Sequence, residues 1–452
     1  MRHATVVRDP VHGDIELTSE ELQLIDTAEF QRLRGVKQLG TAYLVFPGAT
    51  HSRFEHSLGT VHALGGLLDA VDRNADRDPA GCLRTTPQER RILRMAALLH
   101  DVTHAPFGHN IEDQTGLLER HDVPARFRAV LGDTELGGVL RRLGVHAEVL
   151  SVLTGAEDAS VPPFWRQVLS DTIDADLMDY LRRDAYYTGL ELRYDDRVRS
   201  WFRVDRRSQR LYVDCAKQGM LREDVVSELI RMLEIRYHFS ERVYYHHAKV
   251  AAGALLARTV ELALTGGALD PVTLQRATDE SLLFHLERAE LDTAEDTDRL
   301  RRFVARFRRR ALPKRVLVLP AYGNEAVQDQ LVERFFAPNA PQDRRAWEAE
   351  MESEARRALG RDVDVLLYCP ARRMQLKEAR TLVRFPDGDG DIRPMEDFAD
   401  RLPRLGDLRD CYPRLWKLYV FTSESDPDAR RALQRICMAN LPDGASNALR
   451  MS

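Results

Sequence analysis

The sequence has 452 residues, of which 44% are hydrophobic and 30% are charged. This length predicts two or three domains, and the composition is typical of a soluble globular enzyme or a large binding protein. The net charge of −5 gives no general reason to expect nucleic acid or an anionic membrane as a partner.

Signals for secretion and membrane insertion are not visible in the sequence. No uncharged apolar stretch approaches the length of a bilayer span. The first residues, Met1–Thr5, lack the apolar core of a signal peptide. The five cysteines are odd in number, widely scattered and without a Cys-x-x-Cys pair. We therefore expect a reduced cytoplasmic protein with no membrane partner.

The first part of the chain predicts a β-hairpin followed by helices. Thr18–Glu21 is a helix start signal, because a threonine that can cap the helix precedes two glutamates, and Thr85-Thr86-Pro87 is a second one. The expected elements are strands at 5–7 and 15–17, helices at 18–30, 30–38 and 54–71, and loops at 45–50 and 74–86.

A helix at 89–100 is the segment on which the functional prediction depends. Ile92, Met95, Ala96 and Leu99 are spaced at i, i+3, i+4 and i+7, the pattern of a buried helical face. Further helices are expected at 126–131, 136–143, 164–171, 174–187 and throughout 223–263, with one short strand at 210–214.

The character of the chain changes after about residue 265. Arg301–Arg315 contains eight basic residues in 15. Strands are expected at 316–319, 363–369, 381–385 and 418–422, with helices at 344–359, 395–401 and 428–438. We predict a mainly α protein: a helical domain with an N-terminal β-hairpin at 1–265, a helical basic connection at 266–315, and a smaller α+β lobe at 316–452.

The predicted helix at 89–100 ends in His100-Asp101, and His104 and His109 follow closely. Charge at the end of a buried helix is costly unless it is paired or bound to a metal. The dipeptide alone is weak evidence, because a chain with 14 histidines contains about one His-Asp pair by chance, and a second occurs at His121-Asp122. A satisfied surface or core histidine is the ordinary interpretation of any one of these residues. The buried helix and the neighbouring histidines favour a site at His100-Asp101.

A metal site needs further ligands from other elements, because His100 and Asp101 alone cannot surround an ion. His56 and Asp176 are the candidates, since both lie at or in helices expected to pack on 89–100. Two imidazoles and two carboxylates suit Fe, Mn, Ni, Zn or Mg. Such a set leaves coordination positions open for water and substrate, which favours catalysis over a structural metal.

This arrangement resembles the HD-domain phosphohydrolase superfamily, whose signature is H…HD…D, and within it the deoxynucleoside triphosphate triphosphohydrolases. The resemblance covers residues 5–265 strongly and 360–440 more faintly. It therefore implies an HD-type helical phosphohydrolase core in the first domain. The motifs that carry it are Asp9–Gly13, Ile25–Thr27, Phe30–Arg34, Lys37–Gly40, Val45–Ala49, Arg53–Gly59, His100-Asp101 and Asp174–Asp184.

The resemblance implies hydrolysis of a dNTP between the 5′ oxygen and the α-phosphorus, which releases a deoxynucleoside and inorganic triphosphate. The residues that would bind the divalent metal ion are His56, His100, Asp101 and Asp176. The catalytic residues implied near the α-phosphate and the leaving oxygen are His104 and His109, supported by His121 and Glu112. A histidine four residues after a metal ligand is alternatively a structural hydrogen-bond donor.

The same resemblance implies a substrate-binding set. Arginines suit the polyphosphate, because the guanidinium makes forked hydrogen bonds to phosphate. The tyrosine matched to the aromatic under the 2′ carbon would reject ribose by its bulk. Alternatives are a solvated helix face for the second arginine and core packing for that tyrosine. The implied residues are Arg53 and Arg236 at the phosphates, and Gln38, Leu39, Tyr180, Asp184 and Tyr244 around the sugar.

Asp26, Gln31 and Arg34 match a guanine-reading set in a regulatory site between subunits. The resemblance therefore implies activation by GTP or a dNTP and a homo-oligomer, either a dimer or a tetramer. The spacing of these residues is also that of an exposed helix end.

Several residues depart from the family pattern. Leu177 stands where a lysine is expected after the metal-binding aspartate, and Asp122 stands where glutamate is common. Basic residues expected near the N-terminal strand are replaced by Thr5 and Arg8. These departures affect the expected triphosphate contacts and the activation mode, and leave the metal ligands in place.

Two other functions remain open from the sequence. The first is an HD phosphohydrolase that acts on another nucleotide, either a nucleoside monophosphate or a signalling nucleotide, which the Leu177 departure favours slightly. The second is a binding module, in which the HD domain senses a nucleotide or Arg301–Arg315 binds nucleic acid. The basic run more often forms a solvated helix, so nucleic acid is not the favoured partner.

Overall fold

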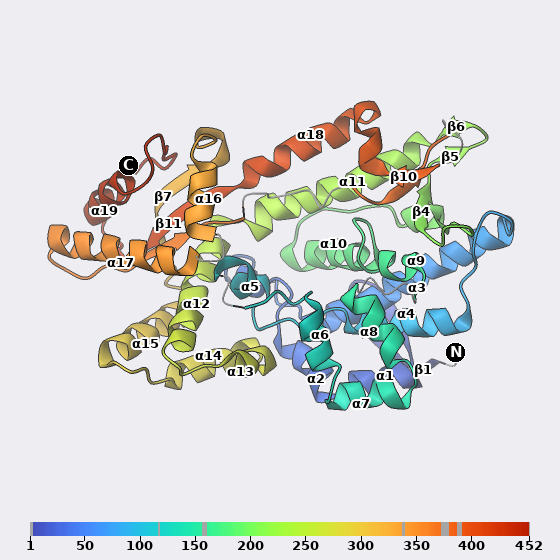
Figure 1. Cartoon of the computed structure of the whole chain (residues 1–452), viewed down its shortest axis with the longest axis horizontal. Coiled ribbons are helices and arrows are strands. Elements are labelled where there is room, and N and C mark those ends of the chain that lie inside the picture. Colours follow the sequence, from blue (N-terminus) through green and yellow to red (C-terminus); the bar gives the residue numbers. More distant parts are fainter. Residues whose placement is uncertain are drawn as a thin grey trace.

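The computed structural model describes residues 3–115, 118–155, 161–336, 340–371, 379–386 and 391–451. The chain is mainly helical, as predicted, and its strands form small sheets (Figure 1). The elements of its first part are β1 (His3–Asp9), β2 (Gly13–Thr18), α1 (Ser19–Ile25), α2 (Ala28–Gln31), η1 (Arg32–Gly35), η2 (Gly40–Leu44), α3 (Arg53–Arg77), α4 (Pro87–Leu99), α5 (His109–Thr115), α6 (Pro124–Val130), α7 (Glu135–Arg142), α8 (His146–Thr154), α9 (Pro163–Gln167), α10 (Ala175–Thr188) and η3 (Asp196–Trp201).

The remaining elements begin with a small sheet and end in the C-terminal helix. They are β3 (Phe202–Val204), β4 (Leu211–Asp214), β5 (Ala216–Lys217), β6 (Met220–Leu221), α11 (Glu223–Phe239), η4 (Ser240–Tyr244), α12 (His247–Thr265), α13 (Pro271–Arg276), α14 (Asp279–Arg288), α15 (Ala294–Arg308), β7 (Lys314–Pro320), η5 (Ala321–Gly323), α16 (Gln328–Phe336), α17 (Ala340–Leu359), β8 (Val365–Tyr368), β9 (Leu382–Arg384), β10 (Ile392–Pro394), η6 (Met395–Arg401), α18 (Pro403–Cys411), η7 (Tyr412–Leu415), β11 (Lys417–Thr422) and α19 (Pro427–Ala439).

The helix start signals in the sequence are confirmed as caps. Thr18 begins α1 and Thr86 begins α4, and each forms a capping box with the glutamate three residues later. Pro87 occupies the first turn of α4, where a missing backbone N–H costs nothing. Several boundaries differ from the prediction, and the helix expected at 18–30 is divided into α1 and α2. The long helix α3 continues to Arg77, into the region expected as a loop, and the helix expected at 30–38 is a short α-helix followed by a 3₁₀ turn.

The core of the first part is formed by α3, which packs between α4 and α10. Its face toward them is fully buried at Val61, Leu64 and Leu68. Burying one leucine side chain contributes about 2 kcal/mol of transfer free energy, so this stripe holds the three helices together. The packing brings the N-terminal turn of α3 beside the C-terminal end of α4.

The helix expected throughout 223–263 is interrupted, which corrects the sequence prediction. α11 ends at Phe239, a π turn follows at Ser240–Tyr244, and α12 starts at His247. The sequence gives no warning of this break, because the residues around it, 236–248, contain neither proline nor glycine. π turns occur often at functional sites, and this one carries Tyr244, a predicted substrate residue.

The C-terminal lobe contains the predicted strands, and three of them form an antiparallel sheet. β11 lies in the middle of this sheet, whose order is β7-β11-β8, and it is seen beside β7 in Figure 1. Helices α12 and α17 pack against β8. The inner residues of this sheet, such as Leu317, Leu367 and Val420, are almost fully buried. The basic helix α15 packs on α12, and its Arg308 forms ion pairs with Glu280 at 2.6 Å and Glu287 at 2.7 Å.

The C-terminal region returns to the first part of the chain. Strand β9 pairs in parallel with β4, so that the sheet has the order β10-β9-β4-β3. Arg384 on β9 donates to Asp214 on β4 at 2.7 Å, and α18 packs along α11 (Figure 1). The division at residues 265 and 315 remains a prediction, and this sheet crosses it.

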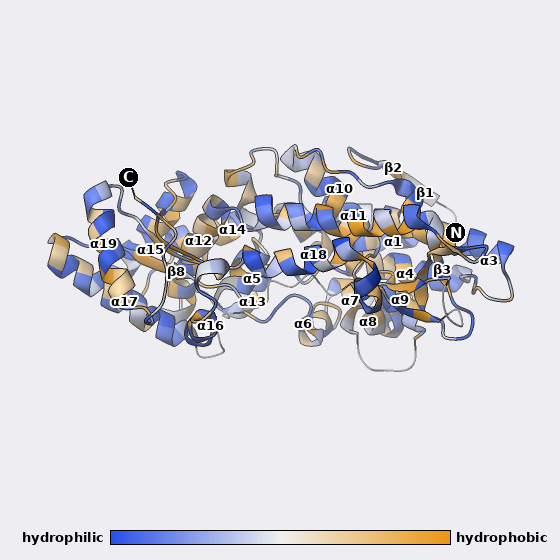
Figure 2. Cartoon of the chain, turned by 90° about the horizontal axis from the view of Figure 1, so that it is seen from above, coloured by the Kyte–Doolittle hydropathy of each residue, from blue (hydrophilic) through white to orange (hydrophobic). Residues whose placement is uncertain are grey.

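Apolar and polar residues alternate along most helices in Figure 2, as expected for elements with one buried face. Within the described residues, no helix combines the length and the apolar character needed to cross a membrane.

Candidate metal centre and nucleotide site

The four predicted metal ligands come together where α3, α4 and α10 meet. His56 lies in the first turn of α3, His100 and Asp101 follow the last turn of α4, and Asp176 lies in the first turn of α10. His56 and Asp101 are buried, while His100 and Asp176 are partly exposed. The site therefore has a closed base and an open side.

The distances between the ligand atoms fit one ion. His56 Nε2 lies 2.9 Å from Asp176 Oδ1, 3.1 Å from His100 Nε2 and 3.7 Å from Asp101 Oδ2. His100 Nε2 lies 3.6 Å from an oxygen of each aspartate. Metal–ligand bonds of about 2.0–2.2 Å place neighbouring ligand atoms about 3.0–3.5 Å apart. His56, His100 and Asp101 offer ligand atoms that all lie within 4.8 Å of one another, and Asp176 contacts both imidazoles from the more exposed side.

The hydrogen bonds of the two imidazoles prepare them for a cation. His56 Nδ1 donates to Asp179 Oδ2 at 2.7 Å, and His100 Nδ1 donates to the Ala97 carbonyl at 2.7 Å. In the neutral form each ring then presents an unprotonated Nε2, and these two acceptor atoms face each other at 3.1 Å. Two lone pairs at this distance repel each other unless a proton or a metal ion lies between them.

The electrostatics of the site also favour a cation. Burial acts to lower the pKa of His56, but hydrogen bonds to Asp176 and Asp179 outweigh it and raise that pKa to about 10. Burial acts to raise the pKa of Asp101, yet the charges of Arg53 and His100 hold it well below its ordinary value. Positive charge is therefore stabilised where the four ligands converge.

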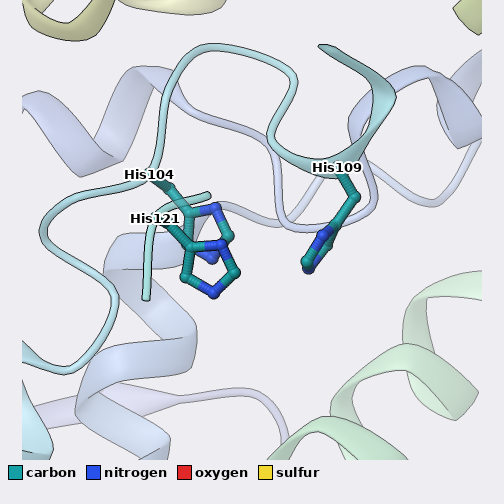
Figure 3. Close-up of side chains that lie close together, drawn as sticks. All are labelled: His104, His109 and His121. Atoms are coloured by element: carbon teal, nitrogen blue, oxygen red, sulfur yellow. The ribbon is translucent and has the colours of Figure 1, made fainter. Parts of the chain in front are cut away.

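The predicted catalytic histidines form a second cluster beside this centre. Figure 3 shows the rings of His104 and His121 stacked, with His109 across from them. The His104 and His121 centroids are 3.5 Å apart, and His109 lies 5.3 Å from His104 and 5.1 Å from His121. His121 Nδ1 donates to Glu112 Oε2 at 2.8 Å, and His109 Nδ1 lies 3.0 Å from Asp113 Oδ2.

His104 connects the two clusters. Its Nε2 lies 3.2 Å from Asp101 Oδ1, and its Nδ1 lies 3.7 Å from Glu112 Oε1. Burial, with the charges of Arg53 and His121, lowers the pKa of His104 to about 3. The imidazole is therefore neutral, and its Nδ1 is among the buried atoms of the described residues that have no hydrogen-bond partner.

The three histidines of the second cluster offer ring nitrogens within 4.8 Å of one another. A metal binds an imidazole nitrogen in the plane of the ring. The planes of His104 and His121 differ by only 21°, so their nitrogen lone pairs point in nearly parallel directions instead of converging.

The two predicted phosphate-binding arginines have different surroundings. Arg53 is buried, its Nη1 donates to Asp101 Oδ2 at 2.6 Å, and within the described part of the chain its Nε is a buried atom without a hydrogen-bond partner. Arg236 is half-buried on α11. Burial acts to lower its pKa, but Tyr180, Tyr412 and Tyr244 raise it. This environment differs from the solvated helix face considered as the alternative.

Asp184 and Tyr244, two of the predicted sugar residues, contact each other directly. The Tyr244 hydroxyl donates to Asp184 Oδ2 at 2.7 Å. The other oxygen of Asp184 lies 3.0 Å from His51 Nε2, and the His51 ring stacks on Tyr187. The π turn before α12 thus aims Tyr244 at α10. His51 is a site residue that sequence reasoning missed, although it directly precedes the α3 motif.

The other predicted sugar residues lie nearby. The backbone N–H of Gln38 donates to the His51 carbonyl at 3.0 Å. Its side-chain Oε1 is among the buried atoms of the described residues that have no hydrogen-bond partner, so it is free to accept from a ligand. Leu39 is buried. Tyr180 lies on α10 one turn after Asp176, and burial raises its pKa, so the hydroxyl stays protonated and can donate.

The predicted regulatory residues lie at the end of α1 and in the turns after it. Arg34 Nε donates to Gln31 Oε1 at 2.8 Å, and its guanidinium lies 3.5 Å from the centre of the Phe54 ring. Gln31 donates in turn to the Ile25 carbonyl. Asp26 is exposed. The three residues share one surface, and their regulatory role stays a prediction.

Three residues that the sequence did not single out hold the loop between the two clusters. Arg32 Nη2 donates to the His104 carbonyl at 2.7 Å, and Arg126 donates to the Thr103 carbonyl. Asp279, from α14, accepts from the backbone N–H of Phe107 at 2.7 Å. Phe107 has a φ of 57°, an uncommon conformation for a non-glycine residue that these contacts stabilise. The roles of Arg32, Arg126 and Asp279 depend on tertiary contacts, so they cannot be inferred from the spacing of residues in the sequence.

Comparison with protein families agrees with this geometry. Residues 53–184 match the model of the HD domain, and residues 216–439 match the model of the HD associated region. The chain is an HD-domain protein. The HD domain contains both histidine clusters and all four candidate metal ligands, and the second match crosses the domain boundaries predicted at 265 and 315.

Curated relatives include both uncharacterised and named proteins. The chain is 36% identical over 262 residues to the uncharacterized protein YwfO of Bacillus subtilis, covering 57% of this chain and 55% of that protein. It is 30% identical over 271 residues to human deoxynucleoside triphosphate triphosphohydrolase SAMHD1, covering 53% of this chain and 42% of that protein. The chain thus spans about half the length of these relatives.

Proposed function

We propose that this HD-domain protein is a metal-dependent hydrolase that converts dNTPs to deoxynucleosides and inorganic triphosphate. The observation that carries the proposal is the pair of facing Nε2 atoms of His56 and His100, 3.1 Å apart and flanked by Asp101 and Asp176. The similarity to proteins named as deoxynucleoside triphosphate triphosphohydrolases supports the substrate class.

A divalent ion held by His56, His100, Asp101 and Asp176 supplies Lewis acidity when bound: it polarises a phosphoryl oxygen and lowers the pKa of water. The open side of the site, next to Asp176, leaves room for the α-phosphate. Mn, Fe, Mg, Ni and Zn are all compatible with two imidazoles and two carboxylates.

The protein's own residues then manage the phosphate and the proton. His104 lies between Asp101 and Glu112 and is placed to contact a phosphoryl oxygen. The side chain of His109 is 47% exposed and pairs with Asp113, so it can exchange protons with solvent and is the proposed proton donor to the departing 5′ oxygen. His121 and Glu112 hold the neighbouring ring in place.

Recognition of the deoxyribose is assigned to the other side of the site. The Tyr244 hydroxyl is fixed on Asp184, so its ring is held rigidly where a 2′ hydroxyl would have to fit. The free Oε1 of Gln38 accepts from the 3′ hydroxyl. Arg53 and Arg236 are the proposed phosphate contacts. Leu39 and Tyr180 are the remaining residues proposed to contact the sugar.

The regulatory part of the proposal rests on Asp26, Gln31 and Arg34. The exposed carboxylate of Asp26 can accept from guanine N–H groups, and Arg34 can donate to its carbonyl edge. In this proposal a GTP or dNTP activator binds there in a homo-oligomer, a dimer or a tetramer. A nucleotide other than a dNTP is the second candidate substrate, favoured by Leu177, whose side chain is buried in the core and offers no phosphate contact.

Product analysis tests the reaction. The purified protein is incubated with Mn²⁺ and each dNTP, with and without GTP, and the products are separated. Deoxynucleoside together with intact triphosphate is the expected result, while stepwise release of orthophosphate contradicts it. A nucleoside monophosphate and a cyclic dinucleotide serve as competing substrates for the second candidate.

Replacing the proposed ligands tests the site. In the double variant His100→Ala, Asp101→Ala we expect turnover and metal retention to be lost together, since half of the donor set is removed. Thr86→Ala is a matched control outside the site, because it removes only a helix cap and costs about 1 kcal/mol of stability. Full turnover in the double variant would reject the proposed centre.

A further inference from the structure

The turn Asp9–Gly13, between β1 and β2, has no role in the function described so far. It is one of the motifs that carry the family resemblance, and hydrogen bonds to the Asp9 side chain hold its backbone. Asp9 Oδ1 accepts from the N–H of Val11 at 2.9 Å and of His12 at 2.8 Å, and Gly13 has a φ of 78°, which favours glycine. This local structure directs the His12 ring into the protein.

His12 reaches a buried carboxylate that also contacts the metal centre. Its Nε2 donates to Asp179 Oδ1 at 2.6 Å, while His56 Nδ1 donates to Asp179 Oδ2 at 2.7 Å. Asp179 is fully buried. One carboxylate therefore joins the N-terminal turn to a proposed metal ligand.

An arginine fixes the orientation of the same carboxylate. Arg183 donates to both oxygens of Asp179, through Nε at 2.9 Å and Nη2 at 3.0 Å. Its Nη1 donates to Asp9 Oδ2 at 2.8 Å. The turn thus contacts the Asp179–Arg183 pair twice, with the His12 ring on the carboxylate and the Asp9 carboxylate on the guanidinium. Removing one partner of such a buried charged group is strongly destabilising, because it leaves a charge without compensation.

The backbone of α3 leaves room for this network at one position. A Cβ atom on Gly59 would lie 1.9 Å from Asp179 Oδ1 and 2.4 Å from Arg183 Nη2. Such contacts are impossible without moving the carboxylate. Gly59 lies one turn after His56, so the missing side chain lets Asp179 approach the helix beside the metal ligand.

We propose that the Asp9–Gly13 turn is the outer support of the metal centre, with His12 and Asp179 acting as positioning residues for His56. The inference rests on the metal centre of the proposed function and is independent of which nucleotide is the substrate. By accepting the Nδ1 proton, Asp179 fixes the His56 tautomer that leaves Nε2 free for a metal. His12 holds Asp179 in that position.

Metal affinity is the direct test, because it needs no substrate. The apo full-length chain is titrated with Mn²⁺ alone in competition with a fluorescent chelator, and thermal unfolding of each variant is recorded in parallel. Loss of a carboxylate partner of a metal-binding histidine typically weakens metal binding about 10–100-fold. We expect a loss in this range for Asp179→Asn and a smaller one, about tenfold, for His12→Ala.

Two matched variants separate hydrogen bonding from packing. His12→Gln places an amide N–H near the position of Nε2, so it should restore affinity to within about twofold of the wild type, as expected when the hydrogen bond to Asp179 is kept. His62→Ala removes the ring that stacks on His12 at 4.7 Å and leaves the bond to Asp179 intact. Its Mn²⁺ affinity should equal that of the wild type.

The outcomes are distinct. Wild-type affinity in a folded His12→Ala protein overturns the inference and leaves the metal centre standing, as does a His12→Gln variant as weak as His12→Ala. Since the His12 variants lie at the periphery of the network, they remain informative if Asp179→Asn does not fold. A wild type that binds no Mn²⁺ contradicts both the metal centre and its support, which identifies failure of the proposed function.

Discussion

This molecule has two buried charged clusters, and they differ in whether the residues of the cluster balance one another's charges. Where α17 of the C-terminal lobe packs near α12, Arg258 and Arg344 meet Glu261 and Glu348. Arg344 donates to Glu261 at 2.6 Å and to Glu348 at 3.0 Å, and Arg258 donates to Glu348 at 2.8 Å and to Glu261 at 2.9 Å. Glu348 accepts from two arginines and Glu261 from three, because Arg345 also donates to Glu261 at 3.1 Å, so the cluster supplies its own countercharges.

The metal centre, in contrast, brings together more acceptor atoms than its own residues can satisfy. His56 and His100 direct their Nε2 atoms at each other, and the oxygens of Asp101 and Asp176 lie around them. The outer atoms of the two imidazoles are satisfied, by Asp179 and by a backbone carbonyl, and their inward-facing nitrogens meet further acceptors. Burial of charge alone therefore does not mark a functional site. The informative feature is a convergence of acceptors.

The largest expected effect comes from breaking the closed cluster. Glu348→Gln leaves Arg258 and Arg344 without a full countercharge in a buried site, which typically costs about 3–5 kcal/mol of stability. Chemical denaturation of the variant measures that loss. Its Mn²⁺ affinity, measured below the unfolding transition, should stay at the wild-type value, because the cluster does not touch the metal ligands.

The matched control is Arg345→Gln, which removes the one partly exposed cation of this cluster as the structure describes it. The Arg345 side chain is 41% exposed, so its pair with Glu261 is screened by solvent and should contribute less than about 1 kcal/mol. Equal losses for the two variants would show that the buried cluster is not a cooperative unit.

Binding of Mn²⁺ at the metal centre should stabilise the folded state of the protein. A ligand that binds only the native state at about 100 times its Kd contributes about 2.7 kcal/mol. We expect Mn²⁺ to raise the Tm of the wild type and of Glu348→Gln by the same few degrees, as followed by calorimetry. His100→Ala should show no rise. A rise of equal size in His100→Ala would mean that the ion binds elsewhere.

The sequence predicted local features well. The capping residues Thr18 and Thr86, the strands of the C-terminal lobe and the HD-like helical core are all present in the structure. These depend on short-range rules such as helix caps and hydrophobic periodicity. The family resemblance also predicted that His56 and Asp176 lie beside His100, a long-range arrangement that local patterns do not give.

Features that depend on tertiary contacts could not be predicted. Asp179 was visible as one carboxylate of a helix, but its role is defined by His12, which is 167 residues away in the chain. The π turn that aims Tyr244 has no local signal, and the pairing of β9 with β4 joins Asp214 to Arg384, which are 170 residues apart. Local patterns carry no information about such partners.

Asp279 is a buried carboxyl group outside the two clusters, and its partners are mainly backbone N–H groups. It is fully buried, and it accepts from the backbone N–H groups of Lys37 at 3.0 Å and Phe107 at 2.7 Å, while the Lys37 ammonium lies 3.7 Å away. Burial outweighs these contacts and raises the pKa of Asp279 to about 6. Burial also raises the pKa of Glu348 and of Glu261 against the charges of their arginines, so Asp279 differs from these acids in its partners, which are backbone N–H groups and one lysine.

A raised pKa in the native state makes stability fall as pH rises. The contribution of Asp279 is fully present below pH 3.8, its unfolded pKa, and is lost as pH rises through about 6. Between about pH 5 and pH 7.5 the wild type should lose about 1.4 kcal/mol that Asp279→Asn does not lose. The free energies of unfolding of both proteins at these two pH values measure the difference. Since the amide of the variant cannot titrate, an identical pH dependence in the two proteins would show that the native carboxyl group is ionised throughout, and hence that its backbone N–H and lysine partners offset its burial.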